Sequence, residues 1–275
     1  MLKQRLITAA VLVPLVIWAL LGLQSDIVTL LFTLVSLLAA WEWLTLAGIQ
    51  NRLSKAVLLV LLLSLGSMAV LSLPMAVILS ISLAVWFAAT LLVLVYANKP
   101  LSPVLASLFH SRTFVIVSML LILSGFVASA GLLHSQWQQG PALVLYVLVT
   151  VWLADSGGYF AGKRFGRHKL AVAISPNKTW EGVYGALGLA SIWAVVFHYL
   201  FGQPLGGLFS WWLMTSCIVM VSIVGDLLES VYKRSFHVKD SGQLLPGHGG
   251  ILDRIDSLLS ALPVFTAGLL ILGAR

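Results

Sequence analysis

The stretch MAVILSISLAVWFAATLLVLVY, at positions 75–96, decides the fold, because it contains no charged side chain and is long enough to cross a lipid bilayer. A transmembrane helix needs about 20 mostly apolar residues. The whole chain has a similar character, since 60% of its 275 residues are hydrophobic and only 9% are charged. Soluble domains contain about 25% charged residues. The composition therefore excludes a soluble globule and predicts an all-α, polytopic integral membrane protein.

Nine stretches meet the requirement for a transmembrane helix, although the sixth needs residues 157–161 to complete it. They lie at 6–23, 27–46, 56–73, 75–96, 114–133, 142–156, 183–201, 208–225 and 258–273. Short cytoplasmic loops are rich in Lys and Arg. With nine spans and a cytoplasmic N-terminus, every Lys and Arg except Arg275 falls on the cytoplasmic side. We therefore expect about nine spans, with the N-terminus inside and the C-terminus outside.

The polar residues divide the chain unevenly, because every acidic residue except Asp26 and Glu42 follows residue 150. We expect one integrated membrane domain in which residues 1–140 form a hydrophobic, lipid-facing scaffold. Residues 141–275 would then supply the helices and cytoplasmic loops of a catalytic site. Two loops on that side, 157–182 and 226–257, carry most of the polar residues and can converge on one site.

The second of these loops continues an apolar helix with Asp226, Glu229, Ser230 and Lys233, spaced i, i+3, i+4 and i+7. This spacing places all four on one helical stripe. Asp226 ends an apolar run near the headgroups, where an unpaired carboxylate is costly. Glu229 and Lys233 fit equally well a simple ion pair on a solvated helix end.

The sequence PGHGG at 246–250 is too rich in glycine for a helix. Its backbone can approach a ligand closely and form an anion-binding turn, and the helix that follows adds a favourable dipole for phosphate. That helix carries Asp253 and Asp256 at i and i+3. With Asp226 they make three carboxylates beside basic residues, as Mg²⁺ and a nucleoside triphosphate require. The alternative is a charge-paired network with Arg254, Lys233 and Arg234 that only ties the last two helices together.

The first loop contains Ser175-Pro176, which predicts a helix start with Ser175 as the cap. Lys178 would then lie beside the cap, where it can contact a phosphate. Four further basic residues fit either phosphate contacts or a positive surface attracted to anionic lipid: Lys163, Arg164, Arg167 and Lys169.

Two acidic residues within the expected spans, Glu42 and Asp155, are functional candidates by default. Glu42 fits equally well a hydrogen bond to a neighbouring helix. Asp155 is the stronger candidate, because it adjoins the first loop.

These motifs resemble the signature of the phosphatidate cytidylyltransferases, also called CDP-diacylglycerol synthases. The longest reads Ser230-x₂-Lys233-Arg234-x₄-Lys239-Asp240-x-Gly242-x₂-Leu245-Pro246-x-His248-Gly249-Gly250-x₂-Asp253-Arg254-x-Asp256. The elements at 154–157 and 175–182 also look like that family, with Asn177 where relatives often carry a second Lys. The resemblance covers roughly residues 150–260 by motif, and the earlier helices match only in being hydrophobic.

The resemblance implies the reaction CTP + phosphatidate → CDP-diacylglycerol + pyrophosphate, with Mg²⁺ as cofactor and a second cation left open. Asp226 and Asp253 would hold the metal, and Asp256 would be a further ligand or would support the ligands. The residues expected in catalysis are Asp226, Asp253, Asp256, Lys239 and His248. The residues expected to bind substrate are Lys178, Ser230, Lys233, Arg234, Asp240, Gly249, Gly250 and Arg254. For His248, stabilising its own turn is an equal alternative.

The partners expected are CTP, phosphatidate and the lipid bilayer, without nucleic acid, and the resemblance is compatible with a homodimer. We expect a bacterial inner membrane, with the site facing the cytoplasm. Three alternatives differ in their patterns. A polyprenol kinase-like enzyme would release CDP, a CDP-alcohol phosphotransferase would carry a different aspartate motif, and a transporter would spread polar residues along several helices.

Overall fold

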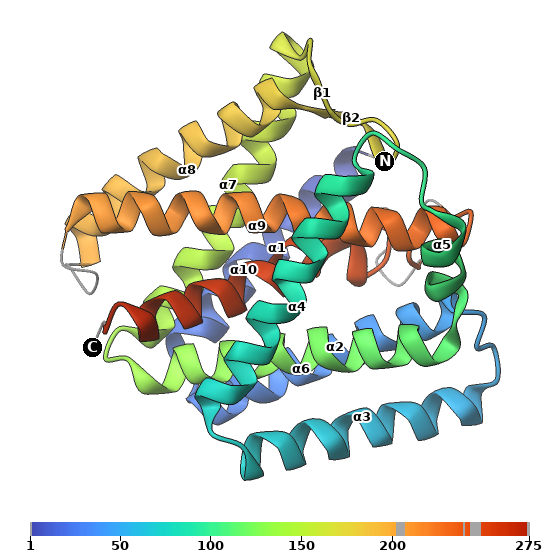
Figure 1. The fold of residues 1–275 in the computed structure, drawn as a ribbon. Helices are drawn as coiled ribbons and strands as arrows, with labels where there is room; N and C mark the ends of the chain where they lie inside the picture. Colours follow the sequence, from blue (N-terminus) through green and yellow to red (C-terminus); the bar gives the residue numbers. More distant parts are fainter. Residues whose placement is uncertain (1, 202–206, 239, 243–248, 274–275) are drawn as a thin grey trace.

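The computed structural model describes residues 2–201, 207–238, 240–242 and 249–273. The chain is mainly helical, with one small antiparallel hairpin between α7 and α8 (Figure 1). The elements are α1 (Leu2–Gly22), α2 (Ser25–Leu46), α3 (Arg52–Ser72), α4 (Met75–Tyr96), α5 (Pro103–His110), α6 (Arg112–Gln136), α7 (Gly140–Phe165), β1 (Lys169–Ala171), β2 (Ser175–Thr179), α8 (Trp180–Phe201), α9 (Leu208–Ser235) and α10 (Leu252–Ile271).

The all-α, polytopic membrane architecture predicted from the sequence is confirmed. Among the described residues, eight helices are long and apolar enough to cross a membrane, namely α2, α3, α4, α6, α7, α8, α9 and α10. In α1 the apolar stretch Ala10–Gly22 is shorter. The count of nine spans and the cytoplasmic N-terminus therefore stay predictions.

Several helices run beyond the apolar stretches that predicted them. Helix α7 continues to Phe165 and α9 to Ser235, while α10 already begins at Leu252. Hydrophobicity marks only the part of a helix that can lie in lipid, and it does not end the helix at the headgroups. Lys and Arg side chains in the last turns of α7 and α9 complement the helix dipole there.

The predicted helix start at Ser175-Pro176 is wrong. These residues begin β2, whose Ser175 and Thr179 pair with Ala171 and Lys169 of β1. The helix starts at Trp180, and the hydroxyl of Thr179 accepts a hydrogen bond from the N–H of Gly182 at 3.2 Å. Thr179 therefore does the capping, because strand pairing with a distant segment overrides the local preference of Ser-Pro.

Two pairs of helices approach unusually closely at glycines. A Cβ on Gly157 of α7 would lie 2.4 Å from the carbonyl oxygen of Gly185 on α8. A Cβ on Gly225 of α9 would lie 2.5 Å from the carbonyl oxygen of Asp256 on α10. Small residues at such crossings let membrane helices pack backbone against backbone. The second crossing brings the acidic residues of α9 and α10 together.

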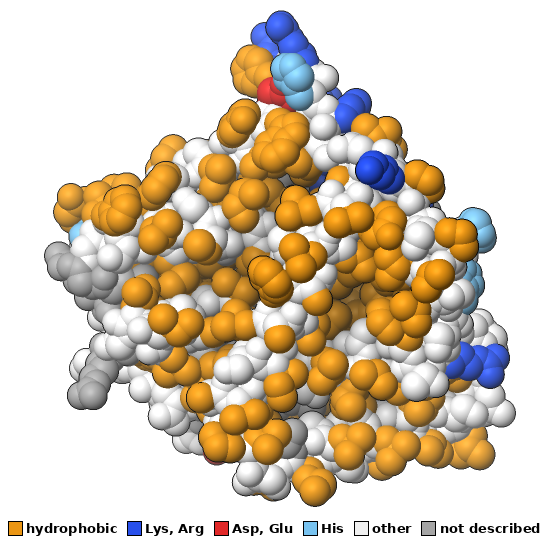
Figure 2. Space-filling view, viewed as in Figure 1, with side chains coloured by type: hydrophobic (Ala, Val, Ile, Leu, Met, Phe, Trp, Pro, Cys, Tyr) orange, Lys and Arg blue, Asp and Glu red, His pale blue; other side chains and the backbone are white. Residues whose placement is uncertain are grey.

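Helix α10 lies in the middle of the bundle, in contact with α2, α4, α6, α7 and α9 (Figure 1). Its side chains from Leu258 to Pro263 are all buried. The view in Figure 2 shows hydrophobic side chains over most of the face, with Lys and Arg side chains gathered at its upper and right-hand edges. An apolar surface bounded by basic residues is what lipid tails and headgroups require.

Candidate active site

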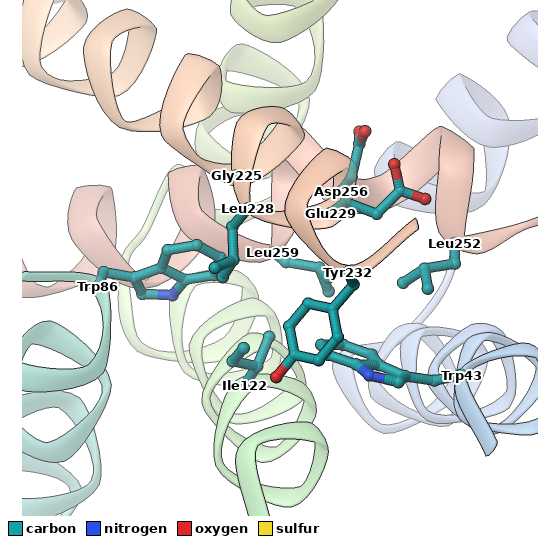
Figure 3. Close-up of a pocket in the computed structure, with 10 residues that line it drawn as sticks. All are labelled: Trp43, Trp86, Ile122, Gly225, Leu228, Glu229, Tyr232, Leu252, Asp256 and Leu259. Atoms are coloured by element: carbon teal, nitrogen blue, oxygen red, sulfur yellow. The ribbon is translucent and has the colours of Figure 1, made fainter. Parts of the chain in front are cut away.

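Helices α9 and α10 bring three carboxylates together where they cross. One oxygen from each of Asp226, Glu229 and Asp256 lies within 4.8 Å of the other two. Figure 3 shows the carboxylates of Glu229 and Asp256 pointing to the same side, at the edge of a small pocket otherwise lined by apolar side chains. The helical spacing of Asp226 and Glu229 and the close contact at Gly225 make this arrangement possible.

This group of three carboxylates fits a divalent cation. Glu229 is 6% exposed, and within the described part of the chain neither of its carboxylate oxygens has a well-oriented hydrogen-bond donor. Among the described side chains it forms an ion pair with Lys233, at 2.5 Å. Carboxylates held this close together repel one another unless a cation lies between them. Hard oxygen ligands of this kind suit Mg²⁺.

Lys233 joins the two helices from the side of this group. Its ammonium lies 2.5 Å from Glu229 and 2.8 Å from Asp253. The ion pair between Glu229 and Lys233, one of the two alternatives that the sequence allowed, is therefore present. Lys233 also pairs with Asp253 of α10. All three side chains are at most 16% exposed, so the ion pairs are largely shielded from solvent, and removal of one partner would leave an uncompensated buried charge.

Asp253 binds mainly to the protein itself. Besides Lys233, it accepts hydrogen bonds from the backbone N–H groups of Ser241, at 3.0 Å, and Gly250, at 2.8 Å. The turn before α10 therefore closes on this carboxylate, and Gly249 takes the positive φ of 83° that such a turn needs. Asp253 lies outside the group of three carboxylates found among the described residues, and Glu229 lies in it. The assignment of Asp253 as a metal ligand stays a prediction.

Glu42 of α2 fixes the start of α10. Its carboxylate accepts hydrogen bonds from the N–H groups of Ile251, at 3.1 Å, and Leu252, at 2.9 Å, and from the hydroxyl of Ser241, at 3.1 Å. The first N–H groups of a helix have no partner within the helix, and Glu42 supplies one from 210 residues away. This confirms the hydrogen bond to another helix that we considered for Glu42.

A cavity of about 580 Å³ opens beside the carboxylates, between α7, α8, α9 and the β-hairpin; its wall is largely apolar but carries several charged side chains, and we call it the polar cavity. Asp155, Lys178 and Asp226 line it. The ammonium of Lys178 lies 2.6 Å from the carboxylate of Asp226. The hairpin thus places the Lys178 ammonium beside the group of three carboxylates. The sequence had predicted Lys178 beside a helix cap, but it lies in β2. Asp155, which adjoins the same carboxylates, belongs to the cavity.

The remaining predicted residues lie in different places. Asp240 packs near Gly249, and Ser230 is half-buried on α9. Arg234 points away from the carboxylates, because its Nε donates to the carbonyl of Ile174 and its side chain lines a separate depression. Arg254 lines an apolar groove on another face of α10. Lys239 and His248 lie outside the described residues.

Comparison with known proteins bears on what this site does. The model of a family described as the cytidylyltransferase family matches residues 3–272. The chain belongs to the cytidylyltransferase family. The match includes the N-terminal helices, in which the sequence showed no motif of the family. It confirms the resemblance described from the motifs. The chain is accordingly an enzyme of the nucleotidyltransferase class.

Two curated relatives of this chain are similar along nearly their whole length, and a third is similar over about half. A protein of Pseudomonas aeruginosa named phosphatidate cytidylyltransferase is 42% identical over 275 residues, which cover 97% of this chain and 96% of that protein. One of the same name from Haemophilus influenzae is 36% identical, covering 97% and 98%. A Bacillus subtilis protein of that name is 44% identical over 126 residues, 46% of each chain.

Proposed function

We propose that the chain transfers the cytidylyl group of CTP to phosphatidate, giving CDP-diacylglycerol and pyrophosphate. The observation that carries the proposal is the group of Asp226, Glu229 and Asp256 beside a cavity that Asp226 and Lys178 line. The relatives named phosphatidate cytidylyltransferase support the choice of substrates. They also favour nucleotidyl transfer over the kinase-like and transporter alternatives.

The reaction is a displacement at phosphorus. An oxygen of the phosphatidate phosphate attacks the α-phosphorus of CTP, and the bond from that phosphorus to the oxygen of the β-phosphate breaks. Phosphatidate is already anionic at neutral pH, so the step needs no strong general base. Catalysis then consists of holding the two phosphates in line and offsetting their charge.

The protein's own groups divide this work. Asp226, Glu229 and Asp256 are the residues that would hold Mg²⁺, which when bound neutralises the triphosphate and the leaving pyrophosphate. Lys178 reaches the cavity from the hairpin and exchanges its contact with Asp226 for a substrate phosphate. Lys233 keeps Glu229 and Asp253 in place.

We place this reaction at the cytoplasmic face of a bacterial inner membrane. There CTP arrives from water while the acyl chains of phosphatidate stay in the bilayer. Extracting the chains would cost about 0.8 kcal/mol for each CH₂ group. The basic side chains at the edge of the apolar surface and the bacterial relatives support this location.

The test is product formation from radiolabelled CTP by purified protein in detergent, with phosphatidate and Mg²⁺ present or omitted. We expect cytidine label in the lipid and released pyrophosphate. An Asp256→Asn variant should lose about 10²-fold or more in rate. The matched control is Asp26→Asn, an exposed acid in the first turn of α2, which should keep full activity. Release of CDP with a phosphorylated lipid alcohol, or no turnover by a well-folded sample, would refute the proposal.

The identity of the metal ligands is tested separately, by Mn²⁺ binding measured with electron paramagnetic resonance. If Glu229 is a ligand and Asp253 acts through the turn, Glu229→Gln weakens Mn²⁺ binding by about tenfold or more, and Asp253→Asn weakens it less. The reverse order would restore Asp253 to the ligand set. Equal binding by both variants and the unchanged protein would show that neither residue holds the ion.

A further inference from the structure

An apolar groove of about 460 Å³ runs between α1, α2, α7 and α10, apart from the polar cavity. Of the described residues that line it, Arg254 alone is charged. Val28, Phe126 and Ile255 form part of its floor and are buried, while Leu31 at its edge is 39% exposed. The groove is therefore open toward the surroundings of the bundle.

Helix α10 separates this groove from the carboxylates by showing a different face to each. Ile251, Arg254, Ile255 and Leu258 line the groove at i, i+3, i+4 and i+7. Asp256, two residues beyond Arg254, belongs to the carboxylate group. The groove and the reacting site are thus two sides of the same helix.

Helix α7 divides the two spaces in the same way. Leu148 and Trp152 line the groove, whereas Asp155 lines the polar cavity. Arg254 interacts electrostatically with Asp155. The charged end of the groove therefore meets the polar cavity between α7 and α10.

An apolar groove with the Arg254 guanidinium at one end suits an amphiphile that has an acyl chain and an anionic head. The planar guanidinium can bind a phosphate through two parallel hydrogen bonds. A water-soluble nucleotide has no group that would gain from the rest of the groove.

We propose that this groove holds an acyl chain of the phosphatidate and that Arg254 binds its phosphate at the entrance to the polar cavity. The inference rests on the proposed function and adds where the lipid substrate lies. It assigns Arg254 to the lipid phosphate, whereas Lys178, which lines the polar cavity, serves the nucleotide.

The first test narrows the groove without touching the reacting groups. Leu31→Trp places a larger side chain at its edge. The matched control is Leu63→Trp, because Leu63 is 44% exposed and lines another apolar groove, of about 380 Å³, between α2, α3 and α6. We expect Leu31→Trp to raise KM for a dipalmitoyl phosphatidate about tenfold. KM for CTP, and KM for a dihexanoyl phosphatidate, should stay unchanged. An equal effect of Leu63→Trp, or none from Leu31→Trp, would overturn the proposal.

The second test needs no catalysis, so it separates this proposal from the proposed function. A phosphatidate with a photoreactive diazirine at the end of one acyl chain is irradiated with the protein, and the labelled residues are found by mass spectrometry. We expect label on groove residues such as Leu31, reduced by unlabelled phosphatidate but not by phosphatidylcholine, and weakened by Arg254→Gln. Equal competition by phosphatidylcholine would show a general lipid contact and overturn the proposal. Groove labelling by a protein without transferase activity would refute the proposed function alone.

Discussion

Replacing Glu42 with glutamine should destabilise the protein through the start of α10. In the structure one carboxylate oxygen accepts from Ser241 and Leu252, and the other accepts from Ile251. Glutamine can keep the first oxygen, but its NH₂ group then faces the N–H of Ile251. Hydrogen bonds to a charged group contribute about 1.5–3 kcal/mol and neutral ones about 0.5–1.5 kcal/mol, while an unsatisfied buried donor costs about 1–3 kcal/mol.

The weaker hydrogen bonds and the unsatisfied N–H of Ile251 together should lower the free energy of unfolding of Glu42→Gln by about 3 kcal/mol. The side chain cannot rotate out of the problem, because Gly242 and Gly250 pack directly against its carboxylate. The measurement is a denaturant titration of detergent-solubilised protein followed by circular dichroism. Asp26→Asn, on an exposed side chain of the same helix, should change the result by less than about 0.5 kcal/mol. A loss below about 1 kcal/mol for Glu42→Gln would mean that this carboxylate does not hold α10.

Three further substitutions test the site. Gly225→Val should force α9 from α10 and lower activity about 10²-fold, whereas Gly188→Val, which meets open space, should not; equal rates in the two variants would contradict the crossing. Lys233→Met should lower the free energy of unfolding by about 3 kcal/mol, because it leaves Glu229 and Asp253 without their cation. Lys233→Arg should recover part of this loss. An unchanged free energy of unfolding in Lys233→Met would contradict the bridging role. Gly249→Ala should cost about 1 kcal/mol because its φ is positive, while Gly188→Ala, inside α8 with open space around it, should not destabilise the protein in the same titration.

The long helices and one stripe of the site could be predicted from the sequence because both depend on local spacing. Runs without charge are as long as a bilayer is thick, and the spacing of Asp226, Glu229 and Lys233 fixes a common face of α9 whatever surrounds it. The sequence also predicted that acidic residues of two helices would meet, since the end of α9 and the start of α10 both carry acids and lie on the same side of the membrane.

Other features depend on contacts between distant segments and could not be predicted. Glu229 looked like half of a surface ion pair, and only the close crossing at Gly225 places it among the carboxylates. Arg254 and Asp256 lie on different faces of α10, although they are only two residues apart in the motif. Ser175 and Pro176 carry a true helix-start signal, which pairing with β1 overrides.

The bond between Glu42 and the start of α10 also has a consequence for biosynthesis. Helix α2 leaves the ribosome before α10, because Glu42 precedes Leu252 by 210 residues. A carboxylate inside an apolar bundle is costly while it lacks its partners. Until α10 has been made, α2 must therefore keep Glu42 near the headgroups or pair it with another hydrogen-bond donor. The arrival of α10 removes this cost and in the same step brings Asp256 to Asp226 and Glu229, so we expect a chain truncated before α10 to leave Glu42 as an exposed polar defect in the membrane.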